Sequence, residues 1–115
     1  MHSMRVVILS SHSLFAEGVA SRLRQHSEYV DLHHVDVRQP NSLQRVLDAR
    51  PSVVILDATE PDIDRQCPLG AMFQSLPSLK VIRLDPHQDH VQVVTSEKRL
   101  AGEVRDLVDL IEGNI

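Results

Sequence analysis

Short apolar runs rich in β-branched residues alternate along this chain with segments of helical periodicity, and this alternation limits the folds that it can adopt. The apolar runs are residues 5–9, 29–37, 52–57 and 79–84. Apolar residues recur at helical spacing in residues 16–23, 43–47, 69–76 and 103–112. Strands that alternate with helices predict a three-layer α/β sandwich, with helices on both faces of a mostly parallel sheet.

The connection after the fourth strand is too short for another parallel crossover. Only residues 85–90 separate that strand from a further strand-like run at residues 91–95. A parallel neighbour needs a connection of about a dozen residues or more, whereas a hairpin needs only a few. We therefore expect an antiparallel fifth strand at the sheet edge, no helix between strands four and five, and a last helix over residues 103–112. Residues 58–68, with two prolines and three acids, are expected to form a loop.

Length and charge exclude several classes of protein. The 115 residues predict a single domain over residues 1–115, and 12 basic against 16 acidic residues give a net charge of −4. A negative net charge does not supply the basic surface that binding to nucleic acid phosphates requires. One cysteine permits no internal disulfide, and no apolar run approaches the length of a membrane span. We expect a cytoplasmic protein that contacts neither nucleic acid nor membrane.

Motifs of nucleotide-dependent enzymes and hydrolases are missing from the sequence. It contains no Gly-x-x-x-x-Gly-Lys phosphate loop, no Gly-x-Gly-x-x-Gly and no Gly-x-Ser-x-Gly nucleophile elbow. The chain is therefore not expected to be an enzyme.

Two segments resemble the receiver domain of bacterial response regulators. Residues 8–18, Ile-Leu-Ser-Ser-His-Ser-Leu-Phe-Ala-Glu-Gly, are similar to the start of receivers in which an acidic pair precedes His-Pro-Leu-Phe. Residues 50–62, Arg-Pro-Ser-Val-Val-Ile-Leu-Asp-Ala-Thr-Glu-Pro-Asp, are similar to the strand that ends in the phosphoacceptor aspartate. The resemblance covers about residues 4–85 and implies a flavodoxin-like sheet of order 2-1-3-4-5 in a two-component signalling protein.

The resemblance assigns roles to individual positions, and the sequence departs from several of them. Asp57 stands at the phosphoacceptor position. Ser10 and Ser11 replace the acidic pair that supplies charge to Mg²⁺, and Asp85 stands near the Thr or Ser switch residue. Lys98 does not align clearly with the lysine of the family. Phosphoryl transfer depends on positioning and on charge neutralisation. These changes therefore argue against a switch that works by phosphorylation, whereas the fold of a receiver is still expected.

Three functions remain open. The first is a stand-alone pseudo-receiver module that acts by protein–protein interaction, without phosphoryl transfer and without a cofactor. The second is a phosphoaccepting receiver modified at Asp57, with Mg²⁺ held by Asp57 together with Glu60 or Asp62. The third is a small-ligand or metal-binding α/β module that uses the same crevice.

Other polar clusters are expected to be structural rather than chemical. Glu60, Asp62 and Asp64 are predicted to be solvated loop acids. Asp85, His87, Asp89 and His90 suit zinc or nickel, but they also suit an ordinary turn. His33 and His34 point to opposite faces of a strand, so one packed and one exposed ring is expected. Cys67 precedes Pro68 at a helix start, and nearby acids favour an unreactive thiol.

The expected partner is a signalling protein in trans, which the sequence does not identify. The fifth strand, residues 91–95, carries valines at positions 91, 93 and 94 and no charge, so it leaves an edge that can pair with another chain. A homodimer through this edge or through the last helix is one hypothesis, and a monomer is the other.

Overall fold

The computed structural model describes residues 4–11, 13–26, 29–85, 87 and 91–96. The strands are β1 (Met4–Leu9), β2 (Val30–Val35), β3 (Val53–Asp57), β4 (Lys80–Leu84) and β5 (Val91–Thr95). The helices are α1 (Ser13–His26), α2 (Ser42–Ala49), α3 (Ile63–Gln66) and α4 (Leu69–Ser75). The helix predicted at residues 103–112 and Lys98 lie outside the described residues.

The strands form one sheet of order β2-β1-β3-β4-β5. β1 pairs in parallel with β2 and with β3, and β3 pairs in parallel with β4. β5 runs antiparallel to β4, because residues 85–90 leave no room for a crossover. The predicted strand order and the antiparallel edge are both confirmed.

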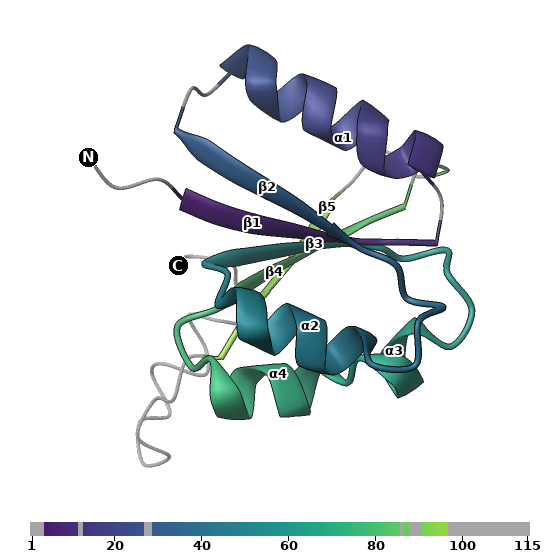
Figure 1. Ribbon diagram of the computed structural model, residues 1–115, viewed down its shortest axis with the longest axis vertical. Coiled ribbons are helices and arrows are strands. Elements are labelled where there is room, and N and C mark those ends of the chain that lie inside the picture. Colours follow the sequence, from purple (N-terminus) through teal and green to yellow (C-terminus); the bar gives the residue numbers. More distant parts are fainter. Residues whose placement is uncertain (1–3, 12, 27–28, 86, 88–90, 97–115) are drawn as a thin grey trace, which may run out of the picture.

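Helices cover both faces of the sheet, as the alternation of strand and helix predicts (Figure 1). α1 lies over one face, and α2, α3 and α4 lie over the other. The chain therefore has the predicted three-layer α/β arrangement with flavodoxin-like topology.

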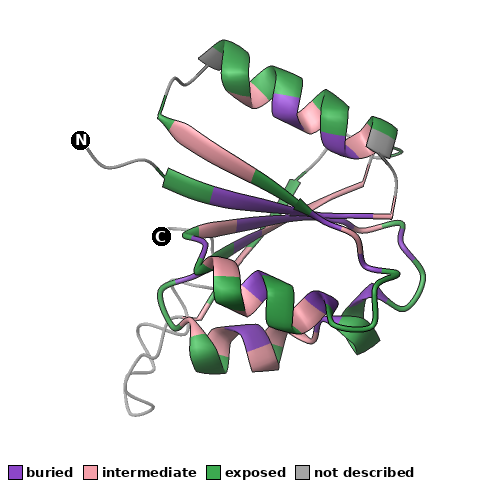
Figure 2. Cartoon of the chain, in the orientation of Figure 1, coloured by how far each residue is buried: buried purple, intermediate pink, exposed green. Residues whose placement is uncertain are grey.

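The main core lies between the sheet and α2, α3 and α4. Val7, Val54 and Val81 stand side by side on neighbouring strands, and all three are fully buried. Met72 of α4 and Val46 of α2 close this core from the helix side. Figure 2 shows buried residues concentrated in the central strands β1 and β3, as expected for parallel strands covered on both faces.

A smaller core lies under α1. Ile8 of β1 packs with Ala16 and Ala20 of α1, with Phe15 and Leu32 at its margin. These helix positions belong to the predicted apolar stripe, so the orientation of α1 follows from its sequence.

The segment expected to be a loop contains one helical turn, which corrects the prediction for residues 58–68. α3 begins after Asp62, whose φ of 64° places it in the left-handed region, and it buries Ile63 in the main core. A helix of four residues is too short to leave a periodic apolar pattern. The turn carries the chain from β3 to α4 across the end of the sheet.

Candidate functional site

The candidate site lies at the carboxyl ends of β1 and β3, in the middle of the sheet. From β1 the chain passes outward to β2, and from β3 it passes outward in the opposite direction to β4. Loops diverge at such a point and leave a crevice, which is where open α/β sheets bind ligands. Ser10 and Ser11 follow β1 here, and Asp57 ends β3.

Asp57 is held by its own loop. Its side chain is 2% exposed, and Oδ1 accepts hydrogen bonds from the Thr59 backbone N–H at 2.9 Å and the Thr59 hydroxyl at 2.5 Å. An aspartate that accepts from the residue two positions later forms a common turn. Thr59 was not identified as a site residue from the sequence, although the spacing Asp-x-Thr is typical of such a turn. The turn therefore fixes the position of the Asp57 side chain from within the chain.

Glu60 is not the solvated loop acid that the sequence suggested. It is 8% exposed, and its Oε1 accepts hydrogen bonds from the Ser11 backbone N–H, at 3.0 Å, and from the Ser11 hydroxyl. The loop after β3 therefore folds back over the end of β1 and delivers a carboxylate there. The structure thus joins Ser11 and Glu60, which lie 49 positions apart in the sequence.

Ser10 is fully buried at the end of β1 and connects this strand to β2. Its N–H donates to the Val35 carbonyl at 3.2 Å, and its own carbonyl lies 3.0 Å from His34 Nε2. The expectation of one packed and one exposed histidine is wrong, because His33 and His34 are both exposed. β2 is an edge strand and is covered less completely than the central strands, so both rings stay open to solvent.

A charged pair at the end of β2 lies within electrostatic reach of the crevice. Arg38 donates from Nη2 to Asp36 Oδ2 at 2.9 Å and from Nε to Oδ1 at 3.1 Å. These side-chain bonds, and a further bond from the Arg38 backbone N–H, lower the pKa of Asp36 to about 2. Asp36 in turn raises the pKa of Arg38, and the negative charge of Glu60 raises it further. The Asp36–Arg38 pair thus lies at the rim of the crevice, with Arg38 held by Asp36 and mostly exposed.

Two of the other acids named from the sequence form ion pairs with arginines. Asp62 pairs with Arg65 at 3.1 Å, and Asp64 pairs with Arg83 at 3.0 Å. Asp62 and Asp64 are exposed, as expected for loop acids. Asp62 is therefore directed to α3 rather than to the Mg²⁺ position considered for it.

Asp85, at the end of β4, faces its own loop. Its Oδ1 accepts from the His87 N–H at 2.9 Å, which is ordinary turn chemistry. Asp89 and His90 of the same predicted cluster lie outside the described residues. Across the described ranges, no group of three or more His, Cys, Asp or Glu side chains is arranged to hold a metal ion.

Cys67 is buried in the main core beside Ser42. Its Sγ lies 3.5 Å from Ser42 Oγ, and burial raises the pKa of the thiol. A raised pKa keeps the sulfur protonated and poorly nucleophilic, as the sequence suggested. Cys67 is therefore a packing residue.

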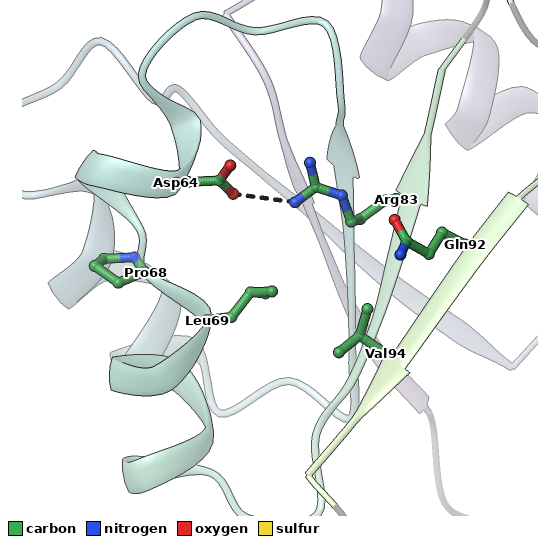
Figure 3. Close-up of a pocket in the computed structure, with 6 residues that line it drawn as sticks. All are labelled: Asp64, Pro68, Leu69, Arg83, Gln92 and Val94. Carbon is green, nitrogen blue, oxygen red and sulfur yellow. Dashed lines mark hydrogen bonds and ion pairs between the residues drawn. The ribbon is translucent and has the colours of Figure 1, made fainter. Parts of the chain in front are cut away.

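A shallow hollow on the same side of the sheet as α3 and α4 has a volume of about 390 Å³ (Figure 3). It is lined by Asp64, Pro68, Leu69, Arg83, Gln92 and Val94. The Asp64–Arg83 ion pair bridges it from α3 to β4. Because Asp64 is well exposed, this pair contributes little to stability. Asp57 is not among the lining residues, so the hollow is separate from the crevice.

Comparisons of the chain with protein-family models, with curated proteins and with solved structures find no match. Within the described ranges, no helix combines the length and apolarity that crossing a membrane requires. The function is therefore inferred from the residues of the crevice.

Proposed function

We propose that this chain is a pseudo-receiver signalling module that acts by protein–protein contact and does not transfer phosphoryl groups. The observation that carries the proposal is the bond between Glu60 and Ser11 at the end of β1. The resemblance of the sequence to receivers calls for a metal-binding acidic pair at this position. Here serines stand in its place, and a carboxylate from the opposite loop takes up the Ser11 N–H and hydroxyl.

Charge gives the physical reason. A phosphoryl group at Asp57 would bring several negative oxygens beside the Glu60 carboxylate, and it needs a cation to neutralise them. Mg²⁺ prefers several oxygen ligands with near-octahedral geometry. Asp57 Oδ1 is already engaged by Thr59, and Asp62 is paired with Arg65. These contacts therefore favour a binding surface of fixed conformation over a metal-dependent reaction centre.

The test is intact-mass spectrometry of the chain after incubation with acetyl phosphate and Mg²⁺. The matched control is Asp57→Asn, which keeps an oxygen to accept from Thr59 but removes the nucleophilic carboxylate. We expect unmodified masses for both proteins. A single phosphoryl adduct on the parent chain and none on Asp57→Asn would overturn the proposal.

The contact part of the proposal requires a separate measurement. The immobilised chain should retain a protein ligand equally well in its parent form and as Asp57→Asn, with or without acetyl phosphate. Binding that requires both Asp57 and acetyl phosphate would instead identify a working receiver.

A second candidate is a phosphoaccepting receiver in which Glu60 replaces the charge of the missing acidic pair. The observation in its favour is that the Glu60 carboxylate stands at the end of β1, although it comes from the β3 loop. In that case isothermal titration would detect Mg²⁺ binding by the parent chain, and Glu60→Gln would abolish both this binding and the adduct at Asp57. Glu60→Gln keeps an oxygen that can accept from Ser11, so the loop should stay in place.

A further inference from the structure

Arg83 places a positive charge on the face of the sheet that packs the main core. Its register partner on β3 is Leu56, and Val81 stands two positions before it on β4. Both of these neighbours are fully buried. Side chains two positions apart on a strand lie on the same face, so Arg83 projects towards the side of α3 and α4. Its side chain is only 20% exposed, and a charge withdrawn this far from water needs an anionic partner.

The anionic partner of Arg83 is a carboxylate at the protein surface. Arg83 Nη1 donates to Asp64 Oδ1 at 3.0 Å, and among the described residues this is the one hydrogen bond of the Arg83 side chain. A guanidinium has five N–H donors in a planar fork, so most of its donors are not used by this bond. Asp64 is 69% exposed, and water can therefore replace Arg83 beside it at small cost. An external carboxylate can thus exchange with Asp64 for the same guanidinium.

The hollow beside this ion pair has a polar end and an apolar end (Figure 3). Three polar side chains gather at one end and three apolar side chains line the other: Asp64, Arg83 and Gln92, then Pro68, Leu69 and Val94. Gln92 stands opposite Arg83 in the register of β4 and β5. Leu69 and Val94 are half-buried and pack against the main core. The volume of about 390 Å³ lies within the range of about 300–1,000 Å³ that is typical of small-molecule sites.

The elements around the hollow hold its residues in place. α3 is one turn of four residues and α4 begins only at Leu69, so the helical cover is interrupted beside β4. Arg83 and Gln92 stand on strands, and Leu69 stands on a helix. Groups on strands and helices keep their positions more closely than groups on loops. The guanidinium and the apolar wall are therefore already arranged before a ligand arrives.

We propose that this hollow binds a small aliphatic carboxylate, whose charged end displaces Asp64 from Arg83. The hydrocarbon part of the ligand then rests against Leu69 and Val94, and the Gln92 amide offers a further N–H at the charged end. Asp64 acts as a competitor built into the chain, because it occupies the guanidinium when the hollow is empty. This site lies apart from the crevice at Asp57, so it does not depend on the function proposed for the crevice.

Charge favours a carboxylate over a phosphate as the ligand. A carboxylate carries one negative charge, which Arg83 alone can balance, and its two oxygens match the planar fork of a guanidinium. A phosphate dianion brings a second negative charge, and Arg83 is the one basic residue among those that line the hollow. Asp64 remains nearby after displacement and repels the larger charge more strongly.

A titration of the full-length chain with isocaproate, followed by proton–nitrogen correlation NMR, tests the proposal. The neutral isostere isocaproamide and inorganic phosphate are titrated in parallel, in a buffer without carboxylates. The parent chain is compared with Arg83→Gln and Asp64→Asn. Asp62→Asn is the matched control, because Asp62 is an exposed acid that pairs with Arg65 and does not line the hollow. The dispersion of the spectrum checks that each variant is folded.

We expect isocaproate to shift the amide signals of Gln92 and Leu69 saturably in the parent chain. The two partners of the ion pair should have opposite effects. Arg83→Gln should weaken binding about tenfold or more, since it removes a charged hydrogen bond. Asp64→Asn should tighten binding about two- to fivefold, which is the equivalent of an exposed ion pair. Asp62→Asn should leave the Kd unchanged, and isocaproamide should bind about tenfold more weakly than isocaproate.

Three results would overturn the proposal. The first is the absence of a saturable shift at the hollow in both the parent chain and Asp64→Asn. The second is an equal Kd for isocaproate and isocaproamide, which would reduce the hollow to an apolar surface. The third is tighter binding of phosphate than of isocaproate, which would assign Arg83 to another class of anion.

Discussion

The two faces of the sheet differ in how completely the described helices close them. On β4, Val81 points to α2, α3 and α4 and is fully buried, whereas its neighbour Ile82 points to the side of α1 and is half-buried. On β5, Val94 packs against the main core, while Val93 is mostly exposed. Adjacent residues on the same strands thus have different environments.

The difference follows from the order of elements along the chain. Three helices cross one face before β4 begins, and among the described residues only α1 crosses the other. The main core contains most of the buried apolar residues of the described ranges, and the core under α1 is small. Unequal coverage means that stability is concentrated on one face, while the other still offers surface for contact.

The largest effect is expected when a core side chain is removed from the face that α2, α3 and α4 cover. Met72→Ala should lower the free energy of unfolding by about 2–5 kcal/mol, because Met72 is fully buried and its removal leaves a cavity. Urea unfolding measures this change. Gln74→Ala, an exposed position on the same helix, is the control and should change stability by about 0.5 kcal/mol or less. If Met72→Ala lowered the free energy of unfolding no more than Gln74→Ala does, stability would not be concentrated on the face that α2, α3 and α4 cover.

A smaller effect is expected from the titration of Cys67 in the same core. Burial raises the pKa of this thiol above its ordinary value of 9.0, so the unfolded chain loses the proton first as the pH rises. The unfolded state then binds fewer protons, and stability falls as the pH rises from about 9 through the raised pKa. Unfolding free energies of the parent and of Cys67→Ala between neutral pH and pH 10 should diverge in slope above pH 9. Parallel curves would contradict a buried, protonated thiol.

The smallest expected effect lies at the rim, outside both cores. Arg38→Gln should return the pKa of Asp36 from about 2 towards its ordinary value of 3.8, because the side-chain bonds from Arg38 are the main cause of the shift. Stability from this pair is present above pH 4 and is lost as the pH falls from about 4 to about 2. The change in stability should be small, since Arg38 is exposed. Carbon-13 NMR of the carboxyl group measures the pKa, and an unchanged value in Arg38→Gln would assign the shift to another group.

The sequence predicted the fold well because its signals are local. The β-branched runs and the six-residue connection after β4 determine strand positions and the antiparallel edge. The helical stripe of α1 also predicted which side of that helix faces the sheet.

The site was predicted less completely because its key bond is not local. Glu60 stands among acids and prolines, and only the folding of its loop over β1 buries it against Ser11. Asp57 was found from its position at the end of a strand, but its bonds to Thr59 depend on the conformation of the turn. Residue type alone therefore did not show that Glu60 is buried and hydrogen-bonded whereas Asp62 is exposed.

The antiparallel edge also has a consequence for the time course of folding. β4 and β5 pair residues that are close in sequence, such as Leu84 with Val91, whereas β1 must meet β3 across three intervening elements. A hairpin forms in about 1–10 μs, and pairing between distant strands is slower. β5 can therefore pair with β4 early in folding. The parallel strands then assemble beside a hairpin that has already formed.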